Sequence, residues 1–198
     1  MRLVNSLICA TNKNMKLVTH MDRVLAAAAN AANNGEVPVA AAIVAPDGAI
    51  VSLAENRMVR DANPLHHAEI LAIEAALERT GLPRLENYDI WVSLEPCTMC
   101  AGAIAHARLR RVYFAAFDEK AGAVESGVRF FDSPFCHHKP EIYGGIGASA
   151  ATKMLRDFFQ TVVRFWLYRS DKILLASLFW QASHRHCCGR SQHQRQGR

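Results

Sequence analysis

Two short motifs, each at the expected start of a helix, constrain this chain more than any other feature. They are His67-Ala68-Glu69 and Pro96-Cys97-Thr98-Met99-Cys100. Positions i and i+2 of a helix point to different sides, so His67 and Glu69 can serve one site only off the helix N-terminus. Cys97 and Cys100, three positions apart on their own helix, share a face. The fold must therefore point two helix N-termini at one place.

His67, Cys97 and Cys100 are imidazole and thiolate ligands of the kind that Zn²⁺ takes in proteins. Three protein ligands leave the fourth tetrahedral position open for water, which is typical of a catalytic zinc. Glu69 can then act as acid and base on that water without ligating the metal. Taken singly, the parts have other interpretations, a structural histidine and a redox Cys-x-x-C pair. The joint pattern favours a catalytic zinc.

The chain is long enough, at 198 residues, for one domain with a sizeable core. Its formal net charge of +5 is unevenly distributed. Residues 158–198 carry seven Lys or Arg and one acidic residue, whereas residues 1–157 carry 16 Lys or Arg and 17 Asp or Glu. The positive excess therefore belongs to the C-terminal tail. It gives no reason to expect a nucleic-acid surface on the rest of the chain.

Cysteine usage indicates a reducing compartment. The cysteines are Cys9, Cys97, Cys100, Cys136, Cys187 and Cys188. Two are assigned to metal and the others lack disulfide-framework spacing, so we expect a cytoplasmic protein. No run of about 18 apolar residues exists, and no transmembrane helix is expected. The apolar run at 7–10 is too short for a secretory signal, so residues 1–19 are expected to be a disordered leader, with a weak transit peptide as the alternative.

Local signals predict the order of helices and strands. Thr19 followed by Asp22 resembles a capping box, and Gly35 ends that helix. Asn63-Pro64 is interpreted as the start of the helix that carries His67. The expected elements are a helix at 22–34, strands at 39–45 and 50–54, a helix at 64–79, a strand at 88–93, a helix at 97–106, a strand at 111–115 and a helix at 149–159.

The predicted fold class is α/β, a five-stranded mixed sheet with helices on both faces. The first two strands form an antiparallel hairpin around Pro46-Asp47-Gly48. The strand–helix–strand order over 88–115 implies a right-handed crossover and parallel pairing. Residues 118–142 are expected to form a functional loop that includes a short fifth strand.

One long segment carries a resemblance to a known family. Residues 92–104 read Val-Ser-Leu-Glu-Pro-Cys-Thr-Met-Cys-Ala-Gly-Ala-Ile, and they closely resemble the bacterial tRNA-specific adenosine deaminases of the cytidine deaminase-like superfamily. Further matching segments are 36–39, 56–57, 67–70, Asp118 with Lys120 and Gly122, and 156–159. The resemblance covers roughly residues 20–160, which we assign to a zinc-dependent deaminase domain with the three-layer architecture of that superfamily.

The resemblance implies a homodimer that converts adenosine to inosine at the wobble position of a tRNA anticodon stem-loop. By motif, Asn56 is expected to hydrogen-bond the flipped nucleoside and Val37 to form part of the base pocket. Asp118 is expected to contact a neighbouring ribose, and Phe159 to pack near the anticodon bases. The alternative roles are a turn asparagine, a core valine, a surface aspartate and a core phenylalanine.

Residues 161–198 form a basic tail that we expect to be disordered or a non-native extension. A second metal site at His184, His186, Cys187 and Cys188 is the alternative, but adjacent cysteines do not match ordinary zinc spacing. For the domain itself, two other functions remain open. They are deamination of a free base or nucleoside, such as guanine or cytosine, and a structural zinc or RNA-binding module.

Overall fold

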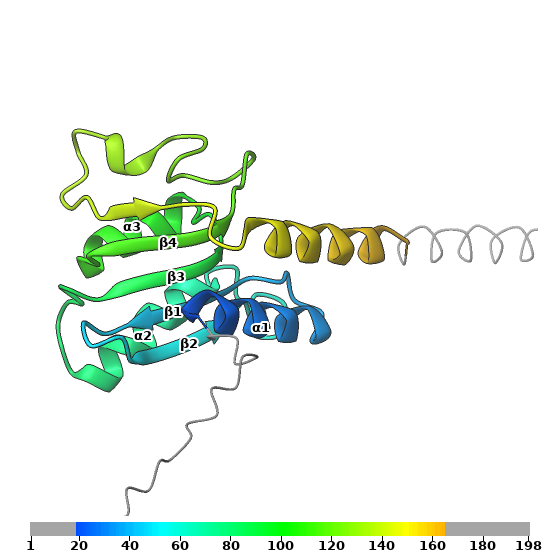
Figure 1. Cartoon of the computed structure of the whole chain (residues 1–198), viewed down its shortest axis with the longest axis horizontal. Coiled ribbons are helices and arrows are strands. Elements are labelled where there is room, and N and C mark those ends of the chain that lie inside the picture. The colour runs from blue at the N-terminus through cyan, green and yellow to red at the C-terminus, as the bar shows by residue number, and fades with distance from the viewer. Residues whose placement is uncertain (1–18, 165–198) are drawn as a thin grey trace, which may run out of the picture. The chain divides into compact units, whose positions relative to one another are not determined.

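The structure, a computed structural model, describes residues 19–164 (Figure 1). The chain divides into two units, one that ends at Thr152 and one that begins at Lys153. Residues 148–164 are helical, so the helix predicted at 149–159 is confirmed but continues to the last described residue. None of the described helices is long and apolar enough to cross a membrane.

The first unit alternates strands and helices in nearly the predicted order. Its elements are α1 (His20–Asn33), β1 (Ala40–Val44), β2 (Ile50–Glu55), α2 (Ala68–Thr80), β3 (Asp89–Leu94), α3 (Thr98–Ala107), β4 (Arg111–Ala116), the 3-10 helix η1 (Phe130–Asp132) and β5 (Glu141–Tyr143). The capping box at the start of α1 is confirmed. The backbone N–H of Thr19 donates to Asp22 at 2.8 Å, and the N–H of Asp22 donates to the Thr19 hydroxyl at 3.2 Å.

The strands form one mixed sheet in the order β2-β1-β3-β4-β5. β1 is antiparallel to β2 and β3, whereas β3, β4 and β5 run parallel. The predicted hairpin, parallel pair and five-stranded mixed sheet are therefore confirmed. Because β3 and β4 run parallel, with α3 as the connection between them, their carboxyl ends lie at the same edge of the sheet.

Helices cover both faces of the sheet, as predicted. Side chains of a strand alternate between the faces. Ile90 and Val92 of β3 are fully buried in the core that the sheet shares with α2 and α3. Trp91 points to the opposite face, where its ring lies 5.3 Å from the ring of His20 in α1. Figure 1 shows α1 in front of the sheet and α2 and α3 behind it.

The helix that carries Glu69 begins later than predicted, so the predicted start at Asn63-Pro64 is wrong. α2 starts at Ala68, with His67 as its N-cap residue. Asn63 instead belongs to a turn, in which its side-chain oxygen accepts a hydrogen bond from the N–H of Leu65 at 3.0 Å. An asparagine acceptor satisfies free backbone donors in such a turn as well as at a helix start. The later start puts Glu69 in the first turn of α2.

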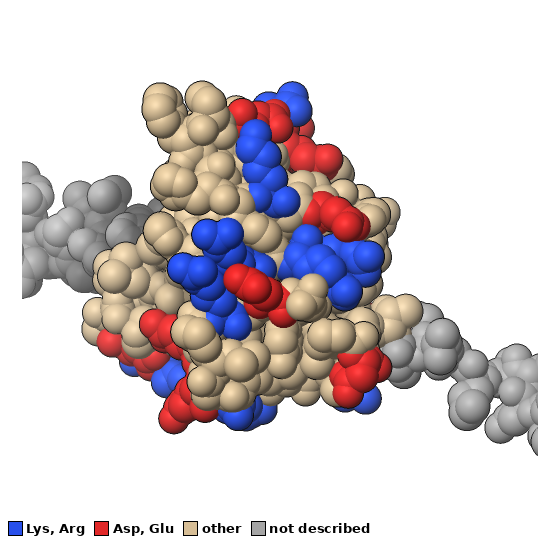
Figure 2. All heavy atoms as spheres, turned by 90° about the vertical axis from the view of Figure 1, so that its left-hand side faces the viewer, with Lys and Arg blue, Asp and Glu red and all other residues tan. Residues whose placement is uncertain are grey.

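The two ends of the parallel strands differ in character. β3, β4 and β5 begin on the side shown in Figure 2, where Lys and Arg lie next to Asp and Glu. Both carboxylate oxygens of Asp89 accept hydrogen bonds from Arg110 at 2.9 Å. Arg111 pairs with Glu141 at 3.0 Å. These ion pairs join the strand starts, while the opposite ends of β3 and β4 lead to the functional site.

Candidate metal centre and adjoining pocket

Two helix N-termini meet at the site, as the sequence predicted. His67 is the N-cap residue of α2 and Cys97 is the N-cap residue of α3. Most N-cap side chains accept a hydrogen bond from their own helix, but neither of these does. Both side chains therefore remain available to each other. The partial positive charges of two helix N-termini also favour anionic ligands there.

The distances between the donor atoms match a tetrahedral zinc site. Nδ1 of His67 lies 3.7 Å from Sγ of Cys97 and 3.5 Å from Sγ of Cys100. All three atoms lie within 4.8 Å of one another. Zinc–sulfur bonds of about 2.3 Å and zinc–nitrogen bonds of about 2.0–2.1 Å, at a tetrahedral angle, require a nitrogen–sulfur separation of roughly 3.6 Å. The donor set therefore fits the metal that the sequence predicts.

The charge states of the two sulfurs also favour a cation. Hydrogen bonds from Cys100 and His67 lower the pKa of Cys97 to about 4, so this sulfur is a thiolate at neutral pH. The hydrogen bond to that thiolate, together with burial, raises the pKa of Cys100. A second thiolate beside the first is unfavourable until a metal ion neutralises the pair, and metal ligation deprotonates a thiol outright.

Glu69 adjoins the three donors but is not one of them. The residue is only 3% exposed, and its Oε2 has no hydrogen-bond partner within residues 19–164. An unpartnered buried oxygen is costly, so its presence indicates a role outside folding. Burial raises the pKa of Glu69 above its ordinary value. Such a carboxyl group holds and releases protons closer to neutral pH than an exposed one.

A cavity of about 200 Å³ adjoins these groups. It is lined by Val37, Val39, Asn56, Met58, His67, Glu69, Leu94, Glu95, Cys97, Asp118 and Ala121. Three residues predicted to bind substrate, Val37, Asn56 and Asp118, thus lie beside the metal donors. The fourth, Phe159, lies in the second unit, where it is 50% exposed and its ring packs edge to face with Phe158. Its role stays a prediction.

Two buried carboxylates that the sequence analysis did not single out support the cavity walls. Glu36 is fully buried and accepts hydrogen bonds from the Asn56 amide at 3.2 Å and the N–H of Arg60 at 2.7 Å. Glu95 is 2% exposed. Burial opposes its charge, but hydrogen bonds from Ser126 and Asp118 hold the pKa of Glu95 below its ordinary value. Its position directly before Pro96-Cys97 is the sequence feature that could have indicated a role for Glu95 near the metal site.

The remaining described cysteine lies outside the site. Cys136 is free, like Cys97 and Cys100, and its thiol donates to the carbonyl oxygen of His138 at 3.0 Å. The alternative metal site at residues 184–188 lies outside the described part of the chain. Within that part, His67, Cys97 and Cys100 form the one group of donors placed to hold a metal ion.

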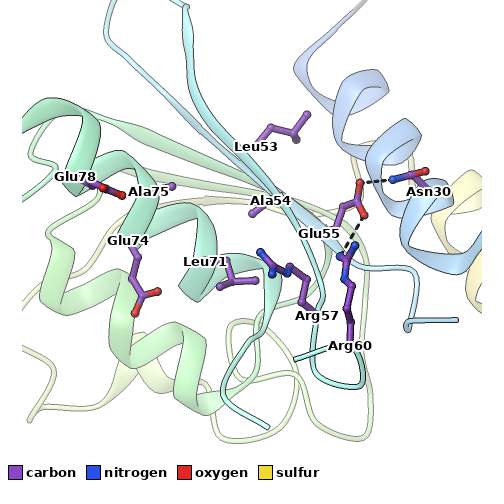
Figure 3. A pocket seen from close by; sticks show the side chains of 10 residues that line it. All are labelled: Asn30, Leu53, Ala54, Glu55, Arg57, Arg60, Leu71, Glu74, Ala75 and Glu78. Atoms are coloured by element: carbon purple, nitrogen blue, oxygen red, sulfur yellow. Dashed lines mark hydrogen bonds and ion pairs between the residues drawn. The ribbon is translucent and has the colours of Figure 1, made fainter. Parts of the chain in front are cut away.

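A larger cavity of about 510 Å³, here called the β2–α2 groove, has a different lining. It is formed by Asn30, Leu53, Ala54, Glu55, Arg57, Arg60, Leu71, Glu74, Ala75 and Glu78 (Figure 3). Glu55 accepts a hydrogen bond from Asn30 at 2.6 Å and pairs with Arg60 at 3.8 Å. The groove thus contains one ion pair, and its lining residues include no metal-donor set.

Comparisons with known proteins agree with this geometry. Residues 15–116 match the family model described as "Cytidine and deoxycytidylate deaminase zinc-binding region". The curated tRNA-specific adenosine deaminase of Agrobacterium fabrum is 48% identical over 144 residues, which cover 72% of this chain and 93% of that protein.

Solved structures support the same relationship. One, from a study of A-to-I editing by tRNA:A34 deaminases at the wobble position of transfer RNA, is 46% identical with a TM-score of 0.67, and the match covers 68% of this chain and 97% of that chain. A guanine deaminase from Nitrosomonas europaea has a TM-score of 0.63, and the match covers 72% of this chain and 86% of that chain. At 21% identity, it shows a shared fold only.

The family match also confirms Zn²⁺ as the cofactor predicted from the sequence, because the matched region is a zinc-binding one and the structure brings a His/Cys/Cys donor set together. The chain therefore belongs to the zinc-binding deaminases of the cytidine and deoxycytidylate deaminase family, and within them to the tRNA-specific adenosine deaminases.

Proposed function

We propose that this protein deaminates adenosine to inosine, by hydrolysis, at the wobble position of a tRNA anticodon. The observation that carries the proposal is Oε2 of Glu69, which has no hydrogen-bond partner among the described residues and is buried beside a donor set of zinc-site dimensions in one cavity. The relatives named tRNA-specific adenosine deaminase support the choice of substrate.

His67, Cys97 and Cys100 would hold the zinc ion. When bound, zinc supplies Lewis acidity that brings the pKa of water at its open position down to about 7. Glu69 then moves the protons. Its carboxylate takes one from the attacking water and delivers it to N1 of adenine, while the water oxygen bonds to C6. Glu69 next takes the proton of the new C6 hydroxyl group and transfers it to the C6 amino group, so that the C6–N bond breaks, ammonia leaves and the C6 carbonyl of inosine forms.

The walls of the cavity would orient the base. The Asn56 side chain donates to the buried Glu36 carboxylate at 3.2 Å, and this contact fixes the direction of its amide. We assign the Asn56 carbonyl oxygen to a hydrogen bond with the nucleoside and Val37 to apolar contact with the base. An adenine must leave its stack to enter such a pocket, and the unpaired bases of an anticodon loop do so at the lowest cost.

We further propose that the enzyme acts as a cytoplasmic homodimer. A third cavity, of about 330 Å³, lies between α2 and α3, and its lining is mostly apolar: Ile70, Ile73, Leu77, Pro83, Ala103 and Ala107, with Glu74 and His106. An apolar groove shared by two helices suits an isologous contact with a second copy. Sedimentation velocity tests this part, and a species of one chain mass at micromolar concentration contradicts it.

The competing function is deamination of a free base or nucleoside, because the same zinc set and glutamate would serve it. A turnover assay separates the two. The zinc-loaded protein is incubated in parallel with an anticodon stem-loop and with free adenosine, guanine and cytidine, and ammonia release is measured. We expect kcat/KM to be highest for the stem-loop. Preferential turnover of a free base would refute the tRNA assignment.

A further inference from the structure

The carboxylate of Glu95 collects five hydrogen bonds from one loop. Its Oε1 accepts from the N–H groups of Val124 at 3.1 Å, Glu125 at 2.8 Å and Ser126 at 2.7 Å. Its Oε2 accepts from the N–H of Asp118 at 3.0 Å and from the Ser126 hydroxyl at 2.7 Å. The carboxylate thus binds both ends of the segment 118–126, which follows β4.

This loop forms one wall of the cavity, and Glu95 connects it to the metal motif. Asp118 and Ala121 of the loop line the cavity together with Glu95. Glu95 itself stands between the end of β3 and the metal-donor Cys97. The Glu95 carboxylate therefore joins the wall that faces the substrate to the segment that carries the metal donor.

Gly122 lets the loop close tightly on this carboxylate. A Cβ at position 122 would lie 2.6 Å from the Glu95 side chain and 2.5 Å from the carbonyl oxygen of Asp118, closer than real contacts allow. The same glycine forms an isolated antiparallel bridge with Cys97. The N–H of Ala123 donates to the carbonyl oxygen of Pro96 at 2.9 Å. The close approach of the loop to Glu95 therefore requires a glycine at position 122.

We propose that Glu95 is a positioning residue that fixes the 118–126 loop as the substrate-facing wall of the pocket and so sets the place of Asp118. The inference rests on the proposed function for its substrate. Glu95 does not contact the reacting atoms in this proposal. It acts on the binding of the anticodon loop through Asp118, and the chemical step remains with Glu69 and the metal donors.

Glu95→Gln is the sharpest variant, because it changes one oxygen only. The carbonyl oxygen of glutamine can keep the three amide donors of residues 124–126. Its NH₂ group takes the place of Oε2 and cannot accept from the N–H of Asp118. We expect KM for the stem-loop to rise roughly 10- to 100-fold, the factor carried by one hydrogen bond to a charged group, with kcat within about threefold of wild type.

Two measurements accompany the kinetics and do not depend on turnover. Zinc content should stay at the wild-type level. Hydrogen exchange at the Asp118 amide should accelerate, while the amides of Val124 and Glu125 stay protected. Glu86→Gln, the same substitution at an exposed position just before β3, serves as the control and should change none of these quantities.

Ser126→Ala gives a second, milder variant that keeps the test decisive if Glu95→Gln does not fold. It removes only the hydroxyl donor to Oε2, and we expect KM to rise about threefold with kcat unchanged. If KM and Asp118 exchange remain at wild-type values in the variants that fold, the positioning role is refuted. A loss of zinc and kcat at unchanged KM also refutes it, because Glu95 would then support the metal site.

Failure of the proposed function would look different. In that case the zinc-loaded wild type would not deaminate the stem-loop at all, whatever residue stands at position 95. The exchange rate of the Asp118 amide in Glu95→Gln would still report whether the carboxylate fixes the loop.

Discussion

The cavity beside the metal donors and the β2–α2 groove are neighbours to which two of the same segments contribute, yet they differ in chemistry. The segment after β2 contributes Asn56 to the pocket and Arg57 to the groove. Helix α2 contributes Glu69 to the pocket and Glu74 to the groove. The groove is the larger of the two, at about 510 Å³ against about 200 Å³.

The difference teaches that volume does not identify the site of chemistry. In the groove, Glu55 has both an amide donor and an ion-pair partner, so its charge is already used by the fold. In the pocket, an oxygen of Glu69 is buried beside three metal donors and has no hydrogen-bond partner in the described part of the chain. Function lies where polar groups converge and are left unsatisfied by the protein itself. Because the two cavities share segments, a groove residue close in sequence can serve as the control for a variant of a pocket residue.

The largest effect is expected from removing a metal donor. Cys97→Ala and Cys100→Ala should each reduce the zinc content from about one ion per chain to near zero and abolish turnover, because two protein ligands do not hold a catalytic zinc. Metal analysis by mass spectrometry after dialysis measures this. Cys136→Ala, which changes a free cysteine outside the pocket, should keep both zinc and activity. If Cys97→Ala and Cys100→Ala both retained zinc, these cysteines would not be the metal ligands.

The next effect is expected at Glu69. Glu69→Gln should lower kcat by roughly 10²–10⁴-fold, the range of general acid–base catalysis, because the amide cannot carry the protons. Zinc content and melting temperature should remain close to wild type. Glu78→Gln, on the same helix but in the groove, should leave kcat within about twofold. Equal effects at the two positions would remove the distinction between the cavities.

A smaller effect is expected at Asn56. Asn56→Ala should raise KM for the stem-loop by roughly 10- to 100-fold, because a pocket built to hydrogen-bond its substrate loses that contact. The neighbouring Arg57→Ala breaks an exposed ion pair with Asp61 on the groove side and should change kcat/KM by less than about threefold. Steady-state kinetics on both variants would contradict the account if Arg57 proved the more sensitive position.

The smallest effect is expected from the tail. We propose that the enzyme is complete within residues 20–160 and that residues 161–198 are dispensable for the chemistry. Truncation after Arg164 should leave turnover within about twofold and weaken nonspecific RNA binding at low salt, since it removes most of the positive excess. Filter binding at several salt concentrations measures this. A folded truncation without activity would place the tail in the enzyme.

The convergence of the two motifs could be predicted from the sequence, because their joint pattern indicates one zinc site and the spacing within each motif restricts where its side chains can meet. The start of α2 could not, because the turn at Asn63 uses the same side-chain acceptor as a helix cap. His67 is a poor N-cap by propensity, and its position there is explained by the metal site, which propensities do not describe. The architecture was predictable for a similar reason, since strand and helix periods are local properties.

The buried carboxylates show where sequence reasoning ends. Glu36 and Glu95 are stable inside the protein because their donors come from segments that are distant in the chain, residues 56–60 and 118–126. No local sequence pattern predicts a hydrogen-bond donor that comes from a distant segment. Asn56 and Asp118 could be named by motif, but the groups that hold them in the pocket walls required the structure.

The most direct test of the central claim is sequencing of tRNA after incubation with the purified, zinc-loaded protein, since inosine is read as guanosine. The account predicts adenosine-to-guanosine changes confined to the wobble position of the anticodon, present with wild type and Glu78→Gln and lost with Glu69→Gln. Unchanged wobble adenosine with the wild-type protein, or equal conversion by Glu69→Gln, would contradict it.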